Sequence, residues 1–299
     1  MKAGIVGVGK LGSIHLRILK EIKAIKEIIL VDIDKAKLRP YKEESFSDYR
    51  KIKNIVDLVI VSSPTSTHFK IARFFLNHRI PVLVEKPITT TLIQAKTLLS
   101  ISQRTKTLLF VGHVERYNSA YLAAKKFILQ PQFIECHRLS PYPHRSLDIG
   151  VVADLMIHDL DIILDIVKDD IKTINAVGVK VLSPYEDIAN ARLTFRRGCT
   201  ANITASRISK EHMRKIRVFA HNCYVSLDYT QQEVELYKKM DNHIIKRRLT
   251  IKKEEPLKQE VVDFVTMVKR NTFSLSSCRK ATCALALALK IQRMIGKNL

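Results

Sequence analysis

The chain has 299 residues, of which 46% are hydrophobic and 27% are charged, a composition typical of a soluble globular protein. This length predicts two domains, each large enough to bury a core of its own. No run of residues approaches the roughly 20 apolar positions of a membrane span. A glycine turn and charges interrupt the apolar stretch at the N-terminus, so no signal peptide is expected either.

The formal net charge is +22. A basic surface could attract nucleic acid or an anionic membrane, and it could equally draw in phosphate-bearing small molecules. The basic residues are spread along the chain, and their one modest cluster consists of Lys246, Arg247, Arg248, Lys252 and Lys253. A solvated basic face is therefore favoured over a nucleic-acid interface.

The cysteines of the chain are scattered and form no CxxC pair. There are five of them, Cys136, Cys199, Cys223, Cys278 and Cys283. An odd number at irregular spacing favours reduced thiols and a cytoplasmic location. No cluster of residues has the spacing of metal ligands, so no metal centre is expected.

The first 34 residues have the order strand, glycine turn, helix, strand. Ala3–Val8 is an apolar run that predicts a buried strand, and it leads into the turn GVGKLG at Gly7–Gly12. A helical pattern follows at Ser13–Lys23. A second apolar run, Ile28–Val31, ends on Asp32. This order, with the acidic residue about 20 positions after the turn, is typical of a dinucleotide-binding βαβ unit.

Each glycine of the turn has a physical role in that interpretation. Gly7 permits the tight turn, Gly9 lets the backbone approach a pyrophosphate, and Gly12 allows helix and strand to pack closely. The turn also contains Lys10 and Leu11, and the N-terminus of its helix offers N–H groups to phosphates. The alternative is a glycine turn in an α/β domain that binds no cofactor.

Asp32 determines which cofactor is expected. Its carboxylate would accept hydrogen bonds from the adenosine ribose hydroxyls, and it would repel a 2′-phosphate. NAD is therefore favoured over NADP, although the nearby Lys35 weakens that preference.

A loop of small polar residues follows the next predicted strand, Val56–Ser62, and leads into a helical pattern at Phe69–His78. Ligands of a doubly wound sheet bind beyond the carboxyl ends of its strands. We therefore expect this loop to contact the cofactor through Ser63, Pro64, Thr65 and His68. A helix cap formed by serine or threonine is an alternative that is compatible with this role.

Another predicted strand, Pro81–Val84, delivers Glu85 and Lys86 to the same edge of the sheet. Both are candidate cofactor contacts. Lys86, if partly buried there, could also assist proton transfer, and the alternative is a surface lysine in a turn. A helix at Thr89–Gln103 and a strand at Thr107–Gly112 continue the alternation of strands and helices.

The pattern changes from about Asn118. Helices are expected at Ser119–Leu129 and Val151–Val167, with an irregular segment at Ser140–Ile149. The remaining strands are predicted at Phe133–Leu139, Ile174–Leu182, Ala189–Arg196, Thr200–Ser206, Ile216–Ala220, Tyr224–Tyr229 and Glu233–Lys238. Their alternation predicts an antiparallel sheet, and helices at Leu257–Arg270 and Arg279–Ile295 close the chain.

We therefore expect an N-terminal Rossmann domain with a doubly wound parallel sheet at residues 1–117. A substrate-binding and oligomerisation domain of class α+β would follow at residues 118–299. The closing helices could pack back on the first domain.

Three polar residues lie on the apolar helix predicted at Val151–Val167. Asp154, His158 and Asp161 are spaced by four and three residues, which places them on one helix face. A neutral imidazole can take a proton from an alcohol, and a carboxylate can orient it. The alternative is a core histidine with satisfied hydrogen bonds.

Further side chains could bind a substrate, since arginine binds phosphate through a planar fork and tyrosine stacks on bases or sugars. The candidates are Arg116, Tyr117, Asn118, Tyr142, His144, Arg145, Asp161 and Arg207. Structural hydrogen bonding is the alternative role for each of them.

Five ordered motifs, GVGKLG, VSSPTSTH, EKP, GHVERYN and DLMIHDLD, resemble the Gfo/Idh/MocA oxidoreductases over nearly the whole chain. The resemblance implies a Rossmann domain joined to an α/β domain with a large open, mostly antiparallel sheet. It also implies that His158 deprotonates an alcohol and that Lys86 orients and polarises it. Asp154 would support both residues, and hydride would pass to the nicotinamide.

The motifs GHVERYN and DLMIHDLD resemble more closely a subgroup that oxidises the 3-hydroxyl of UDP-N-acetylglucosamine. Met156 stands where the broader family often has glycine, and Tyr117 replaces the commoner phenylalanine. One alternative substrate is another polyol, a free sugar or a carbonyl compound. A second alternative is a cofactor-binding sensor without enzymatic activity whose basic surface binds nucleic acid.

Self-association is also expected. An open sheet with one exposed apolar face favours sheet-to-sheet contacts, and hence a homo-oligomer, either a dimer or a tetramer.

Overall fold

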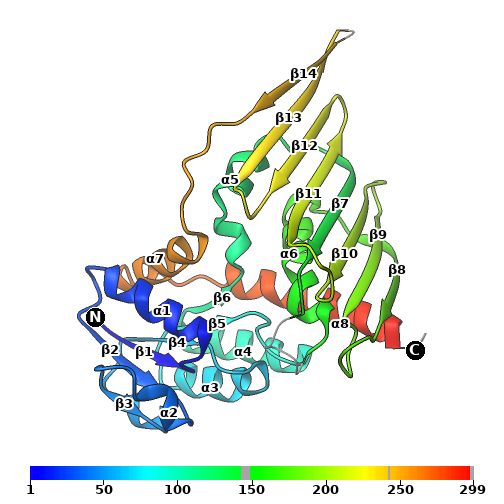
Figure 1. Cartoon of the computed structure of the whole chain (residues 1–299). Helices are drawn as coiled ribbons and strands as arrows, with labels where there is room; N and C mark the ends of the chain where they lie inside the picture. Colours follow the sequence, from blue (N-terminus) through cyan, green and yellow to red (C-terminus); the bar gives the residue numbers. More distant parts are fainter. Residues whose placement is uncertain (143–148, 242, 297–299) are drawn as a thin grey trace. The chain divides into compact units, whose positions relative to one another are not determined.

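The computed structural model describes residues 1–142, 149–241 and 243–296 (Figure 1). The chain forms two compact units. The first unit comprises Met1–His113 and Leu257–Cys283, and the second unit comprises Val114–Pro256 and Ala284–Leu299. The chain therefore leaves the first unit and later returns to it. The functional division at residue 117, with one domain for the cofactor and one for the substrate, stays a prediction.

The first unit is built on a six-stranded parallel sheet in the order β3-β2-β1-β4-β5-β6. Its strands are β1 (Lys2–Val6), β2 (Glu27–Val31), β3 (Ser45–Phe46), β4 (Leu58–Val61), β5 (Val82–Glu85) and β6 (Leu109–Gly112). The last three are buried along their whole length, as expected for parallel strands covered on both faces. The strand order reverses at β1, which pairs with both β2 and β4, and ligands of this fold bind at such a point.

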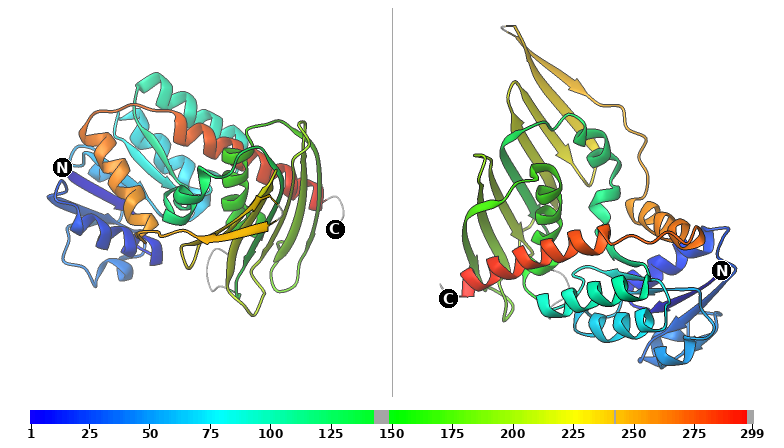
Figure 2. Two further views of the ribbon diagram at one scale, coloured as in Figure 1. Left: turned by 90° about the horizontal axis from the view of Figure 1, so that it is seen from above. Right: turned by 180° about the vertical axis from the view of Figure 1, so that it is seen from behind.

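Helices connect these strands and return to them from the end of the chain. They are α1 (Lys10–Glu21), α2 (Lys35–Leu38), α3 (Thr65–Asn77), α4 (Leu92–Thr105), α7 (Pro256–Lys269) and the first part of α8 (Ser276–Gly296), with a 3-10 helix at Tyr49–Ile52. Helices α3 and α4 lie side by side (Figure 2). The returning segment packs on β6, because the Phe264 and Phe110 rings lie 5.7 Å apart and Val111 N donates to Ser277 Oγ at 2.9 Å.

The second unit is built on an eight-stranded sheet in the order β14-β13-β12-β11-β7-β10-β9-β8. Its strands are β7 (Pro131–Leu139), β8 (Ile171–Val179), β9 (Ile188–Phe195), β10 (Thr200–Ser206), β11 (Met213–Ala220), β12 (Cys223–Asp228), β13 (Glu233–Met240) and β14 (His243–Arg248). Strands β7 and β10 run parallel, and the neighbouring strands pair antiparallel. The predicted fold class, a Rossmann sheet with a larger, mostly antiparallel sheet, is therefore confirmed.

The helices of the second unit cover one face of this sheet (Figure 2). They are α5 (Ser119–Lys125), α6 (Ile157–Val167) and the second part of α8, together with a 3-10 helix at Val114–Tyr117 and a π-helical turn at Val152–Met156. Alternate strand residues such as Ile134 and Ile203 point into the core with Leu160 and Ile291. Period-two burial along the strands produces this one-sided core.

The other face of the eight-stranded sheet carries a row of aromatic rings. Phe133 and Phe219 lie 5.7 Å apart, Phe219 and Tyr224 stack at 4.6 Å, and Tyr224 and Tyr237 stack at 5.0 Å. These residues face each other across β7, β11, β12 and β13. We call them the aromatic row.

The structure differs from the expected elements at a few places. The helix expected at Val151–Val167 begins with a π-helical turn, and the helix expected to reach Leu129 ends at Lys125. Strand β14, which contains most of the basic cluster, was not predicted, nor was the two-residue strand β3. Most of the irregular segment expected at Ser140–Ile149 lies outside the described residues.

Among the described residues, no helix combines the length and the apolar character that crossing a membrane requires.

Candidate functional site

The glycine turn of the first unit lies between β1 and α1. Gly7 has a φ of +96°, and a Cβ added there would lie 2.5 Å from Ser63 N. A Cβ at Gly12 would lie 2.0 Å from the Gly7 carbonyl oxygen. A Cβ at Gly9, in contrast, would meet no described atom within 4 Å. Gly7 and Gly12 are thus required by the protein itself, and Gly9 borders open space that a ligand can enter.

The two helices that start at this edge leave their first N–H groups unbound by side chains. Within the described chain, no side chain caps α1 after Gly9 or α3 after Pro64. In contrast, Thr91 and Asn118 cap α4 and α5 through their side chains. The N-termini of α1 and α3 therefore keep N–H donors available for an anionic ligand.

Asp32 lies at the end of β2 beside the glycine turn. Its Oδ2 accepts a hydrogen bond from Val8 N at 2.8 Å, and its Oδ1 accepts one from Asp34 N at 3.0 Å. Each oxygen keeps a further lone pair. The carboxylate is thus fixed in position and able to accept bonds from two vicinal hydroxyls, such as those of a ribose.

The remaining residues that we predicted as cofactor contacts gather at the same edge of the sheet. Lys10 is exposed, and Leu11 is half-buried at the start of α1. Ser63, Pro64 and Thr65 follow β4 and begin α3. The open space at Gly9, the uncapped helix starts and the oriented Asp32 carboxylate together fit the pyrophosphate and ribose of a dinucleotide.

Glu85 and Lys86 follow directly at the end of β5. Glu85 is buried, and its Oε1 lies 2.8 Å from Nε2 of His15, a fully buried residue of α1. Burial alone would raise the pKa of the Glu85 carboxyl. The hydrogen bond and charge of His15, with the charges of Lys86 and His68, outweigh burial and hold that pKa below its ordinary value. Lys86 itself is half-buried.

His68 is buried in the second turn of α3. Its Nδ1 lies 2.9 Å from the Pro87 carbonyl oxygen, and its Nε2 lies 2.8 Å from the Ser63 carbonyl oxygen. The ring therefore links the loop after β4 to the loop after β5. Both ring nitrogens thus lie against carbonyl oxygens of the protein, although we predicted His68 as a direct cofactor contact.

The second unit carries Asp154 and His158. Asp154 lies in the π-helical turn Val152–Met156, and His158 lies at the start of α6. Both side chains are half-buried, whereas Met156 and Ile157 between them are fully buried. Such π-helical turns are frequent at functional sites, because they change the direction of side chains within a helix.

Arg116 and Asp161 bind each other in the second unit. Arg116 Nε lies 2.6 Å from Asp161 Oδ2, and Arg116 Nη1 lies 2.7 Å from Asp165 Oδ1. Burial would lower the pKa of Arg116, but the two carboxylates outweigh it and raise that pKa. Both residues thus have strong protein partners in this arrangement.

Arg207 and Asn118 are buried as well. Arg207 Nε donates to Asp187 Oδ1 at 2.8 Å, and its Nη1 donates to the Ile149 carbonyl oxygen at 2.8 Å. Asn118 caps α5 and donates to the Tyr229 carbonyl oxygen at 3.0 Å. The contacts of both side chains therefore agree with the alternative role that the sequence left open, which is structural hydrogen bonding.

The remaining predicted substrate contacts lie in or next to the second unit's described segments. Tyr117 and Tyr142 are half-buried, and His144 and Arg145 lie outside the described residues.

Sequence reasoning missed a buried ionic network beneath the GHVERYN motif. Arg138 binds Asp159 through Nε at 2.8 Å and Glu115 through Nη1 at 2.8 Å, and all three residues are buried. Arg138 lies on the same face of β7 as the core residues Ile134 and Cys136, and this period-two position was the only signal for it in the sequence. His15 was also missed, although a histidine on the apolar face of α1 was visible.

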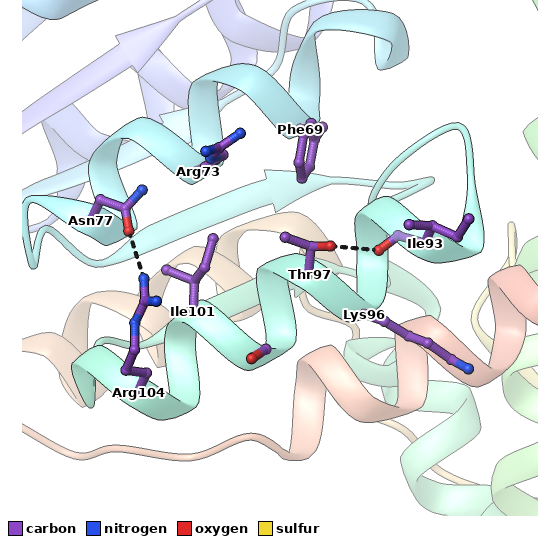
Figure 3. Close-up of a pocket in the computed structure, with 9 residues that line it drawn as sticks. Phe69, Arg73, Asn77, Ile93, Lys96, Thr97, Ile101 and Arg104 are labelled. Carbon is purple, nitrogen blue, oxygen red and sulfur yellow. Dashed lines mark hydrogen bonds between the residues drawn. The ribbon is translucent and has the colours of Figure 1, made fainter.

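One surface groove of about 690 Å³ lies between α3 and α4 (Figure 3). Its lining includes Phe69, Arg73, Lys96 and Arg104, and Arg104 Nη2 donates to Asn77 Oδ1 at 3.2 Å. None of the predicted site residues lines this groove. Among the described residues, no group of three or more histidine, cysteine or acidic side chains could hold a metal ion.

Two family descriptions match the chain. The oxidoreductase family with an NAD-binding Rossmann fold matches residues 1–113, and the GFO/IDH/MocA C-terminal domain matches residues 126–225.

Individual proteins are similar over most of the chain. The UDP-N-acetylglucosamine 3-dehydrogenase of Acidithiobacillus ferrooxidans is 33% identical over 241 residues, which are 79% of this chain and 77% of that protein. A solved structure of the dehydrogenase with that name from the same organism has a TM-score of 0.91 at 28% identity, covering 99% of this chain and 98% of that chain. The inositol 2-dehydrogenase of Salmonella typhimurium is 27% identical over 191 residues, 58% of this chain and 56% of that protein.

Proposed function

This chain belongs to the Gfo/Idh/MocA family of NAD-binding oxidoreductases, and we propose that it oxidises the 3-hydroxyl of a UDP-N-acetylhexosamine. The family and its named dehydrogenases make it a dehydrogenase that acts on a CH–OH group. The observation that carries the choice of substrate is the 33% identity to a UDP-N-acetylglucosamine 3-dehydrogenase.

The residues at the edge of the first unit would hold NAD. The pyrophosphate would lie over Gly9 at the uncapped start of α1, and the Asp32 carboxylate would accept bonds from the adenosine ribose. When bound, NAD supplies the acceptor for the hydride. The carboxylate also disfavours a 2′-phosphate, which supports NAD over NADP.

The proton chemistry would belong to Lys86, Asp154 and His158. In this proposal the His158 imidazole removes the proton of the substrate hydroxyl as the carbon gives up its hydride. The Lys86 ammonium polarises that oxygen and stabilises the negative charge that develops on it. Asp154 orients the base. Each of these three side chains is half-buried, which supports the proposal because partial exclusion of water strengthens the interactions of a polar group.

We narrow the predicted substrate contacts by their surroundings. Tyr117, Tyr142 and Arg145 remain proposed contacts for the nucleotide or the sugar. We propose instead a structural role in the second unit for the residues that bind other protein groups, which are Arg116, Asp161, Asn118 and Arg207. Substitution of any of these four residues should lower the free energy of unfolding and leave the KM for the sugar substrate unchanged.

A polyol such as an inositol is the second candidate substrate. The 27% identity to an inositol 2-dehydrogenase favours it. UDP separates the two candidates, because an enzyme that binds the nucleotide of its substrate is inhibited by UDP and a polyol enzyme is not.

The decisive experiment mixes the protein with NAD and UDP-N-acetylglucosamine and follows the absorbance of reduced nicotinamide. We expect the absorbance to rise, and we expect Lys86→Ala to lower the rate by roughly 100-fold or more because the polarising cation is lost. The matched control is Lys96→Ala, an exposed lysine of α4, which should leave the rate unchanged.

Two outcomes contradict parts of the proposal. Turnover of myo-inositol with none of the sugar nucleotide would replace the substrate. Equal turnover by Lys86→Ala and the unchanged protein would remove Lys86 from the chemistry.

We also propose that the protein is a cytoplasmic homo-oligomer. All five cysteines are free thiols, which fits a reducing compartment. The aromatic row on the outer face of the eight-stranded sheet supports contact with a second copy of the chain, since contiguous exposed aromatic side chains are enriched at protein interfaces.

A further inference from the structure

The side chain of His68 contacts two loops at the edge of the sheet where we propose that the cofactor binds. Its Nε2 lies 2.8 Å from the carbonyl oxygen of Ser63, in the loop after β4. Its Nδ1 lies 2.9 Å from the carbonyl oxygen of Pro87, directly after Lys86. The side chain is 1% exposed, so water does not compete for either nitrogen.

The chemistry of these contacts specifies the protonation state of His68. A carbonyl oxygen only accepts hydrogen bonds, and a neutral imidazole has only one N–H to donate. In either neutral tautomer, one ring nitrogen would direct a lone pair at a carbonyl oxygen less than 3 Å away. Only the imidazolium, which has two N–H groups, forms both hydrogen bonds.

The surroundings of His68 compensate a buried positive charge. The nearby Glu85 is buried and interacts with it electrostatically. Glu85 also binds His15 of α1 at 2.8 Å, and the cation of Lys86 acts on the same carboxylate. One carboxylate at the end of β5 thus faces basic groups from α1, from α3 and from its own strand.

We propose that His68 is an imidazolium at neutral pH and that it is a positioning residue. Its two N–H groups donate hydrogen bonds to the loops after β4 and β5. These hydrogen bonds fix the backbone of both loops next to the cofactor and next to Lys86. An effect of His68 on catalysis rests on the proposed role of Lys86. The connection between the two loops does not depend on that role.

The first test compares NADH affinity across pH by fluorescence titration, from about pH 6 to about pH 9. We expect the unchanged protein to bind NADH about tenfold more tightly than His68→Gln near neutral pH, since glutamine carries both N–H donors on one nitrogen, whereas the imidazolium directs its two donors from separate ring positions. This ratio should shrink as the pH rises, because His68 loses its second proton and glutamine does not titrate. A ratio that stays constant over the range would overturn the proposal.

The matched control is His78→Gln. His78 is the C-cap residue of the same helix and is exposed, and its Nδ1 lies 2.8 Å from the Phe74 carbonyl oxygen within that helix. The same substitution there should change neither the NADH affinity nor its pH dependence. An equal effect at His78 would assign the change to the helix and not to the two loops.

The second test observes the protonation state of the histidine rings directly. The unchanged protein is labelled with ¹⁵N in its histidine rings, and NMR reports whether each ring nitrogen carries a proton. We expect one buried histidine with both nitrogens protonated at neutral pH, and the His68→Gln spectrum assigns it. The absence of any buried histidine in that state would contradict the proposal.

The two tests are independent of the sugar substrate. If UDP-N-acetylglucosamine is not turned over, the NADH titration and the NMR spectrum still decide the state of His68. With any active substrate, His68→Gln should lower kcat as well as NAD affinity, because Lys86 is displaced. A loss of affinity with unchanged kcat would limit His68 to the cofactor loops.

Discussion

At the scale of single residues, Gly9 and Gly12 stand three positions apart and meet opposite surroundings. A Cβ at Gly12 would collide with the Gly7 carbonyl oxygen, whereas a Cβ at Gly9 would meet open space. The backbone of Gly9 has a φ of −79°, which other residues adopt without strain. The packing of α1 therefore requires Gly12, whereas the protein itself does not require Gly9, and we propose that the cofactor does.

Substitutions at these two positions should separate folding from cofactor binding. We expect Gly12→Ala to lower the free energy of unfolding by about 1–3 kcal/mol through overpacking. Gly9→Ala should leave that free energy within about 0.5 kcal/mol, and it should weaken NAD binding by roughly tenfold or more, because the methyl group occupies the path of the pyrophosphate. Denaturant unfolding and a fluorescence titration measure the two quantities. Unchanged NAD binding by Gly9→Ala would count against the position of the pyrophosphate.

The sequence pattern points to these glycines and to Asp32, because the roles proposed for them depend on local backbone geometry. It could not predict the roles of Arg116 and Arg207. Arginine is equally suited to a phosphate and to a buried carboxylate, and only the fold brings Asp161 and Asp187 to them. The same limit applies to His68, whose position at the cofactor edge was expected but whose carbonyl partners lie in two separate loops.

At the scale of elements, a buried ionic cluster joins α5 to α6. Asp165 of α6 binds Lys125 and Tyr121 of α5, and it also binds Arg116. Burial would raise the pKa of Asp165, but its bonds with these three residues outweigh burial and hold that pKa far below its ordinary value. The stability that the carboxylate contributes is therefore present at neutral pH and is lost on acidification.

We expect Asp165→Asn to lower the free energy of unfolding by about 3 kcal/mol at neutral pH, because a buried ion cluster loses its central charge. The difference from the unchanged protein should shrink below about pH 4, where aspartates of the unfolded chain become protonated. Urea unfolding at a series of pH values measures it. Asp170→Asn, at an exposed position just beyond α6, should have little effect. An equal difference at neutral and acidic pH would contradict the role of the charge.

The elements themselves were largely predictable, since period-two and helical apolar patterns mark most of them. Two exceptions have physical reasons. An apolar pattern does not distinguish α-helical from π-helical hydrogen bonding, so the turn at Val152–Met156 was invisible. Strand β14 is exposed at every position and carries basic side chains, which protect a sheet edge from pairing and hide the strand from pattern analysis.

At the scale of the whole molecule, the basic cluster is partly neutralised. Lys246 pairs with Glu235 at 2.7 Å, Lys252 pairs with Glu254 at 2.9 Å, and Arg248 pairs with Glu233. Acidic side chains of the second unit thus form ion pairs with several of the basic side chains that would bind the phosphates of a nucleic acid. This arrangement supports a solvated face, as the sequence favoured.

The aromatic row makes self-association testable. We expect light scattering to report a dimer or a tetramer, and we expect Tyr224→Glu to shift it toward the monomer, because a charge would be desolvated between stacked rings. Thr230→Glu, at an exposed position just after β12, is the control and should not change the mass. A monomer of the unchanged protein at high concentration would contradict the proposed interface.

The return of the chain to its first unit has a consequence for synthesis. Strand β6 is at the edge of the parallel sheet, and its Val111 N–H is bound by Ser277. Phe110 of the same strand packs on Phe264. During synthesis, the ribosome adds more than half of the chain between β6 and these two partner residues. Until then, the apolar edge of β6 is uncovered. The ribosome therefore starts the first unit before the second and completes it later. A nascent chain gains its complete Rossmann unit only after the eight-stranded sheet has been translated.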